Sequence, residues 1–91
     1  MDGATFEAEL QRDGYRIVKG DFTTGDGTAP HIHDYDVRFF VVEGAITIIR
    51  GNDRQTFRAG EECFVAAGTL HAEHVPVDVL RYIAGVRQPG A

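Results

Sequence analysis

The spacing of hydrophobic positions changes near residue 14 of the chain. Within residues 5–13, Phe6 and Leu10 are four apart, which places both side chains on one face of a helix. We expect Thr5 to cap this helix and Gly14 to end it. Farther along, the helical period is lost and short apolar runs are separated by turn residues. The pattern predicts one short N-terminal helix followed by β-strands.

Seven short runs fit such strands. They are residues 15–22, 37–43, 45–50, 54–58, 62–66, 70–75 and 79–86, with a loop at 23–28 and a short extended piece at 31–33. Gly51-Asn52-Asp53 is expected to form a hairpin turn, because Gly and Asn accept positive φ. Short strands at near-regular spacing are typical of an all-β sandwich or barrel.

Composition supports strands and excludes several functional classes. Val, Ile and Thr supply 22 of the 91 residues and Leu only three, and β-branched side chains suit a pleated sheet. No apolar run is long enough to span a bilayer, and the N-terminus does not resemble a secretion signal. The net charge is −5 and the basic residues form no run, which argues against nucleic-acid binding. The single Cys63 cannot form an internal disulfide, so we expect a cytoplasmic protein.

The outward faces of the predicted strands indicate a homodimer. A chain of this length buries apolar surface that only roughly offsets its conformational entropy, so we expect help from a second subunit or a bound metal. Strand parity predicts an outward-facing apolar patch that a second subunit could cover. Its residues are Ile32, Phe40, Val42 and Phe64. Arg38 shares this outward parity and is expected to form an ion pair between sheets or between subunits.

Three histidines occupy positions that one side of a strand would collect. His31 and His33 are two apart, so their rings project from the same face of an extended chain. His71 lies on another predicted strand, with Glu73 on its own face and His74 on the opposite one. Imidazole nitrogens suit transition metals, and three of them leave positions open for reaction. A lone His-x-His pair is also compatible with surface or hydrogen-bonded core histidines.

The spacing around these histidines resembles the two motifs of the cupin family. The matching residues are Gly25, His31-Ile32-His33 and Gly44 in the first motif, and Gly60, Ala66-Ala67-Gly68 and His71 in the second. The resemblance covers residues 25–75. It implies one cupin domain over residues 1–91, a double-stranded β-helix or jelly-roll barrel at about 15–87 after the helix at about 5–13. It also implies that the histidines point into the mouth of the barrel.

Three positions depart from the family pattern. Val37 occupies the position of a glutamate ligand, Ala66 that of a proline and Val75 that of an asparagine. The remaining metal ligands are then His31, His33 and His71. A small three-histidine site resembles that of the non-haem thiol dioxygenase branch of cupins, whose metal is ferrous.

Two carboxylates could replace the missing glutamate. Glu73 shares a face with His71, which favours it as a ligand, a base or an acceptor behind the ligands. Asp36 is next to Val37 but would point the other way unless the strand begins after it. The sequence leaves both open.

Several residues are expected to line the site. Phe39 and Val41 share parity with Val37 and should line the barrel interior, and Cys63 has inward parity as well. Tyr82 on the last strand could present a phenol to the lumen as an acid or substrate contact. Plain core packing is the alternative interpretation of each of these residues.

Two functional hypotheses follow. In the first, Fe, Mn, Ni or Zn bound by the three histidines acts on a small organic molecule, with Glu73 or Tyr82 moving protons; dioxygenation is favoured over isomerisation. In the second, the chain is a non-catalytic small-molecule-binding or sensor module, which the apolar wall would suit. A purely structural dimer is a third possibility. None of the three involves nucleic acid or membrane.

Overall fold

A computed structural model describes residues 1–23 and 27–89, except for the side chains of Phe22 and Thr23. Half of the predicted loop at 23–28, including Gly25 of the first motif, lies outside the described residues. The elements, in chain order, are α1 (Gly3–Arg12), β1 (Arg16–Thr23), β2 (Asp36–Glu43), β3 (Ala45–Arg50), β4 (Asp53–Arg58), β5 (Glu62–Val65), β6 (Ala72–His74) and β7 (Val79–Arg87). In the described part of the chain, no helix has the length and apolar character needed to cross a membrane.

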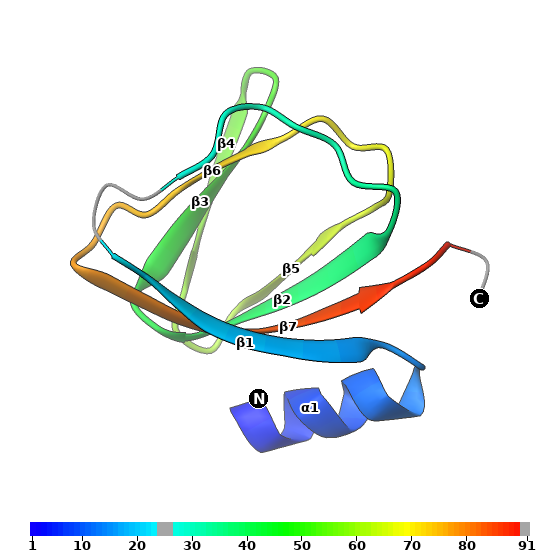
Figure 1. The fold of residues 1–91 in the computed structure, drawn as a ribbon. Coiled ribbons are helices and arrows are strands. Elements are labelled where there is room, and N and C mark those ends of the chain that lie inside the picture. The colour runs from blue at the N-terminus through cyan, green and yellow to red at the C-terminus, as the bar shows by residue number, and fades with distance from the viewer. Residues whose placement is uncertain (24–26, 90–91) are drawn as a thin grey trace.

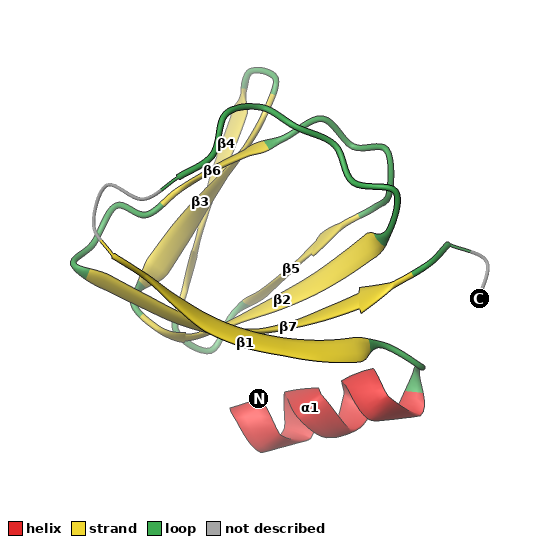
Figure 2. Ribbon diagram, viewed as in Figure 1, coloured by secondary structure: helices red, strands yellow, loops and turns green. Residues whose placement is uncertain are grey.

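The strands form two antiparallel sheets that enclose the interior (Figure 1). One has the strand order β1-β7-β2-β5 and the other the order β4-β3-β6. The first and last strands of the chain are therefore neighbours, and the chain crosses between the sheets several times. The helix lies on the outer face of the four-stranded sheet (Figure 2). This arrangement confirms the predicted all-β double-stranded β-helix with a short N-terminal helix.

The helix begins earlier than predicted. Asp2, and not Thr5, is the N-cap, because its carboxylate accepts the backbone N–H of Thr5 at 2.8 Å. A carboxylate also places negative charge at the positive end of the helix dipole, and the bond to Thr5 lowers the pKa of Asp2. Gly14 follows the helix with φ 78°, a conformation that Gly adopts readily, so the predicted end is confirmed.

The turn after β3 and the segment around His71 also differ from the sequence predictions, whereas the other strand ends agree within one residue. Asp53 pairs with Arg50 and belongs to β4, so the turn contains only Gly51 and Asn52. Only Gly51 has positive φ, as in a type II′ turn, whereas Asn52 does not. The predicted strand at 70–75 shortens to β6, and His71 pairs with His31 through an isolated bridge instead.

The prediction of an outward apolar patch is wrong for Phe40. Its ring stacks on Phe6 of α1 with centroids 5.1 Å apart, and only 3% of Phe40 is exposed. Ile32, Val42 and Phe64 do stay exposed. The helix therefore covers the middle of the outer face, which sequence parity alone could not assign.

The partners of Arg38 also differ from the prediction of an inter-sheet or inter-subunit pair. Its guanidinium bonds Glu9 at 3.0 Å and lies 3.4 Å from Asp13, which follows the helix. It also bonds Glu62 of β5 at 3.1 Å. Burial acts to lower the pKa of Arg38, but the hydrogen bonds to Glu9 and Glu62 outweigh it and raise that pKa. The ion pairs join the helix to its own sheet.

Candidate metal centre

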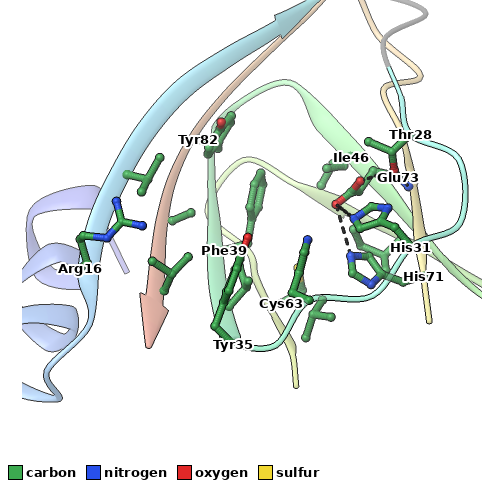
Figure 3. Close-up of a pocket in the computed structure, with 17 residues that line it drawn as sticks. Arg16, Thr28, His31, Tyr35, Phe39, Ile46, Cys63, His71, Glu73 and Tyr82 are labelled. Atoms are coloured by element: carbon green, nitrogen blue, oxygen red, sulfur yellow. Dashed lines mark hydrogen bonds and ion pairs between the residues drawn. The ribbon is translucent and has the colours of Figure 1, made fainter. Parts of the chain in front are cut away.

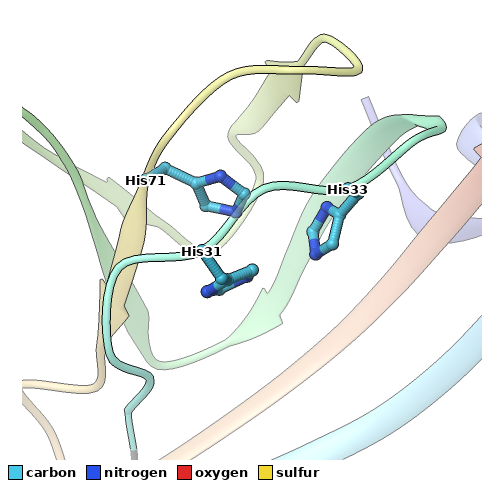
Figure 4. A group of neighbouring side chains, drawn as sticks. All are labelled: His31, His33 and His71. Carbon is cyan, nitrogen blue, oxygen red and sulfur yellow. The ribbon is translucent and has the colours of Figure 1, made fainter.

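Three imidazoles meet at one end of the interior (Figure 4). The ring centroids of His31, His33 and His71 lie 4.4 to 5.0 Å apart. One ring nitrogen from each lies within 4.8 Å of those of the other two. His71 is 2% exposed, whereas the other two rings are partly exposed. The structure therefore brings together the three histidines that the sequence selected.

Backbone hydrogen bonds position the two segments that carry these rings. The N–H of His31 donates to the carbonyl of His71 at 2.9 Å, and the N–H of His71 donates back at 3.0 Å. The carbonyl of His33 accepts from the N–H of Gly68 at 2.8 Å. The segment before β2 is thereby paired with the segment before β6, although about 40 residues separate them.

The tautomers of two histidines follow from their partners. Nδ1 of His31 lies 2.8 Å from the carbonyl oxygen of Ala29, and Nδ1 of His71 lies 2.9 Å from that of Thr69. A carbonyl oxygen only accepts, so Nδ1 carries the hydrogen in both rings and Nε2 keeps its lone pair. This backbone contact is the usual way in which proteins orient a metal-binding imidazole.

His33 is held differently. Its ring stacks on Tyr35, with centroids 4.7 Å apart and an interplanar angle of 7°. Burial, together with the neighbouring His71 and His31, lowers the pKa of His33, so the ring is neutral at neutral pH. Its buried Nδ1 has no hydrogen-bond partner among the described residues. A neutral ring with an unsatisfied nitrogen fits the donor set that a transition metal needs.

Glu73 faces the two Nε2 atoms. Its Oε1 lies 3.4 Å from Nε2 of His71 and 3.8 Å from Nε2 of His31. Its Oε2 accepts a hydrogen bond from the hydroxyl of Thr28, which in turn accepts from the backbone N–H of Glu73 at 3.2 Å. The carboxylate is thus fixed with one oxygen toward the lone pairs. Three imidazoles and a carboxylate suit a divalent transition metal.

Asp36 is engaged elsewhere. Its carboxylate accepts the backbone N–H of Ala67 at 2.8 Å and so ties β2 to the turn after β5. Strand β2 begins at Asp36, so its side chain points away from the face that Val37 occupies. Of the two candidate carboxylates, Glu73 is the one beside the histidines.

A cavity of about 370 Å³ extends from the histidines into the barrel (Figure 3). Val37, Phe39 and Cys63 line it, as expected from their parity. Val41 does not; it is fully buried in the core cluster farther along the interior. His74 is exposed, as its opposite parity predicts.

Tyr82 lies across the cavity from the histidines (Figure 3). Its ring stacks on Phe39 with centroids 4.6 Å apart. Gly20 on the neighbouring strand makes room for it, because a Cβ there would lie 2.6 Å from the phenol oxygen. Burial, and then the charges of Asp21 and Glu73, raise the pKa of Tyr82, so the phenol stays protonated at neutral pH.

Sequence reasoning missed three polar residues of the cavity, which are Arg16, Thr28 and Tyr35. Strand alternation could have found Arg16, because it shares the inward parity of Val18 on β1. Tyr35 and Thr28 lie beyond the strands, so no periodicity indicates where their side chains point. Thr28 bonds Glu73, which lies 45 residues away, whereas Tyr35 stacks on the nearby ring of His33.

A small β-barrel with converging imidazoles at its mouth defines the architectural class of this protein. A profile of the cupin domain matches residues 15–79, and the chain therefore belongs to the cupin family. No curated protein is significantly similar to it in sequence.

Solved structures show the same fold. A cupin-2 domain protein of Shewanella frigidimarina shares 21% identity at TM-score 0.69, with 81% of this chain and 70% of that one covered. An RmlC-like cupin of Methanocaldococcus jannaschii shares 16% identity at TM-score 0.71, with 82% and 70% covered. A predicted oxalate decarboxylase of Thermotoga maritima shares 17% identity at TM-score 0.71, with 88% and 72% covered. At these identities the likeness concerns the fold.

Proposed function

We propose that the chain binds one divalent transition metal, Fe, Mn, Ni or Zn, through His31, His33 and His71. The observation that carries the proposal is the orientation of His31 and His71, whose Nδ1–H groups face backbone carbonyls and leave both Nε2 lone pairs toward a common centre. The backbone pairing of these residues holds that orientation before any ligand arrives. Such preorganisation favours metal binding.

We further propose that Glu73 assists the histidines and that a small organic molecule occupies the adjoining cavity. The Oε1 of Glu73 is close enough to both Nε2 atoms to contact the same ion or to accept a proton from a bound molecule. Tyr82 faces the same space as a protonated phenol and suits proton donation. A divalent ion in this site would supply Lewis acidity or oxygen activation. Dioxygenation is the reaction to test first, and isomerisation the second.

Metal analysis tests the proposal directly. We expect about one transition-metal ion per chain after reconstitution, and we expect His33→Ala to lose it. His74→Ala is the matched control, because His74 is exposed and lies outside the cavity. Circular dichroism checks that both variants fold. A reconstituted wild-type protein without transition metal would remove the enzymatic case.

A non-catalytic binding module is the second candidate. The observation that favours it is the largely apolar wall of the cavity, in which Val18, Val37 and Val65 take part. In this case, small organic molecules would raise the melting temperature equally with and without EDTA. If EDTA abolishes the shift, ligand binding depends on the metal and this candidate fails.

We also propose that the chain forms a homodimer in the cytoplasm. Ile32, Val42 and Phe64 are 47% to 61% exposed, which is high for apolar side chains. The free thiol of Cys63 suits a reducing compartment. Light scattering after gel filtration should give twice the chain mass, and Phe64→Lys should shift it toward the monomer. A monomeric wild-type protein at micromolar concentration would contradict the dimer.

A further inference from the structure

We propose that Arg16 is the anion-binding residue of the cavity, and that the small molecule held there carries a carboxylate at the end remote from the histidines. This inference rests on the proposed function, since the other end of the same molecule would meet the metal centre. It adds the chemical class of the ligand, which is an amphipathic organic acid.

The alternation of β1 places Arg16 on the inward face of the sheet. Arg16 and Val18 both line the cavity, whereas Ile17 between them packs on the helix-covered side. Figure 3 shows the guanidinium of Arg16 reaching into the cavity from the side opposite His31 and His71. Arg16 is exposed to solvent at this end of the cavity, so its charge is accessible to a ligand that enters there.

Several arginines bind groups of the protein itself, whereas the side chain of Arg16 binds none in the described part of the chain. Arg38 bonds Glu9 and Glu62, and Arg87 donates to the carbonyl of Asp13 at 2.7 Å. Within residues 1–23 and 27–89, by contrast, no side-chain hydrogen bond or ion pair engages the guanidinium of Arg16. A carboxylate is the group that a guanidinium binds best, because two parallel hydrogen bonds can form.

The walls of the cavity define the rest of the ligand. Away from the histidines, Thr28 and Glu73, the lining is largely apolar apart from the phenols of Tyr35 and Tyr82, and its apolar residues include Val18, Val37, Ile48, Val65, Ala84 and Val86. Arg16 is the one lysine or arginine among the described residues that line it, and Glu73 is the one carboxylate. Glu73 already bonds Thr28 beside the histidines. An apolar body with an anionic tail matches this distribution of charge.

A competing explanation concerns the edge of the sheet. Strand β1 is an outer strand of its sheet, and inward charges on edge strands discourage pairing with other molecules. That role would require a charge at position 16 but no bound carboxylate. The two explanations therefore predict different effects of Arg16 variants on ligand selectivity.

Ligand affinities measured by calorimetry with zinc-loaded protein distinguish the anion-binding explanation from the edge-strand explanation. The probes are linear hydroxamic acids that chelate the metal at one end and carry a carboxylate at the other, with methylene chains of increasing length. Each is paired with the same molecule ending in an uncharged amide. We expect the carboxylate to bind about tenfold tighter than the amide at the best chain length. The preference should vanish in Arg16→Gln and survive in part in Arg16→Lys.

Arg81→Gln is the matched control, because Arg81 lies in the same sheet on an exposed site with its own partners Asp21 and Glu43. It should keep the full preference. Equal binding of carboxylate and amide by the wild-type protein would overturn the inference while leaving the metal site intact, and this comparison needs no variant to fold. An unchanged preference in Arg16→Gln would also overturn it.

A failure of the proposed metal function gives a different result. The protein would then hold no zinc, or would bind neither member of any hydroxamate pair. Hexanoate and hexanamide with metal-free protein decide the role of Arg16 in that case. A preference for hexanoate that Arg16→Gln abolishes supports the anion site without the metal, and equal binding of the two overturns it.

Discussion

The two faces of the four-stranded sheet are built from the same strands but serve different ends. On the outer face, Phe40 and Ile83 join Phe6, Leu10 and Tyr15 in a closed cluster beneath α1. On the inner face, residues one position away along β2 and β7 line a cavity of about 370 Å³. One face of these strands is sealed by the helix, and the other is left open to a ligand.

The polar groups of the two faces differ in the same way. Arg38 on the outer side lies 5.1 Å from the centroid of the Phe6 ring and is paired with carboxylates of the protein itself. On the inner side, His33 keeps an unsatisfied buried nitrogen, and the exposed Arg16 has no side-chain partner among the described residues. The outer face therefore contributes to stability, whereas the inner face retains binding capacity.

The largest loss of stability is expected from a substitution on the outer face of the sheet, beneath α1. Phe40→Ala should lower the free energy of unfolding by about 3–4 kcal/mol, because Phe40 is almost fully buried against Phe6. Phe39→Ala on the cavity side should cost less, about 1–2 kcal/mol, since its ring already borders open space. Urea denaturation measures both. Equal losses would show that the cavity wall is packed as tightly as the outer face.

Replacing Arg38 tests whether its ion pairs on the outer face stabilise the protein. Arg38→Gln should cost about 2 kcal/mol, because it leaves the carboxylates of Glu9 and Glu62 facing each other without a cation. Arg54→Gln on the exposed strand β4 is the control and should change stability by less than about 0.5 kcal/mol. Thermal and urea unfolding of both variants decide whether the pairing matters. A loss no greater than that of the control would show that the ion pairs of Arg38 add no more stability than an exposed surface charge.

The inner face was the easier of the two to predict from sequence. Period-2 alternation places His31 and His33 on one side of the chain, and the same rule separates Glu73 from His74. The structure places all four accordingly. Such predictions succeed because the direction of a side chain in a strand depends on its immediate neighbours in sequence.

The outer face could not be predicted in the same way, because its partner is a helix from elsewhere in the chain. Parity identified Phe40 and Arg38 as outward, but only the folded chain shows that α1 covers the first and pairs with the second. The same holds for Thr28, whose bond to Glu73 spans 45 residues. Contacts between distant segments depend on the assembled fold.

Substitutions can test whether Glu73 takes the place of the glutamate ligand that the cupin pattern puts at position 37. Glu73→Gln keeps the shape of the side chain and its contact with Thr28 but removes the charge, so zinc affinity should fall about tenfold. Adding Val37→Glu to this variant should recover part of the loss, because residue 37 lines the same cavity. Competition with a fluorescent zinc chelator measures the affinities. An unchanged affinity in Glu73→Gln would exclude the carboxylate from the site.

The smallest expected effect concerns Cys63, which lines the cavity and also belongs to the buried core cluster. Burial raises the pKa of this thiol from 9.0 to about 12, so the reactive thiolate is scarce at neutral pH. A thiol-reactive disulfide reagent should therefore label the native protein slowly, and quickly once urea unfolds it. The unfolded thiol ionises first, so the protonated form stabilises the native state below pH 9 and this contribution is lost as the pH rises toward 12. Rapid labelling of the native protein at neutral pH would show that the cavity wall around Cys63 opens to solvent, and Cys63→Ser provides the unlabelled control.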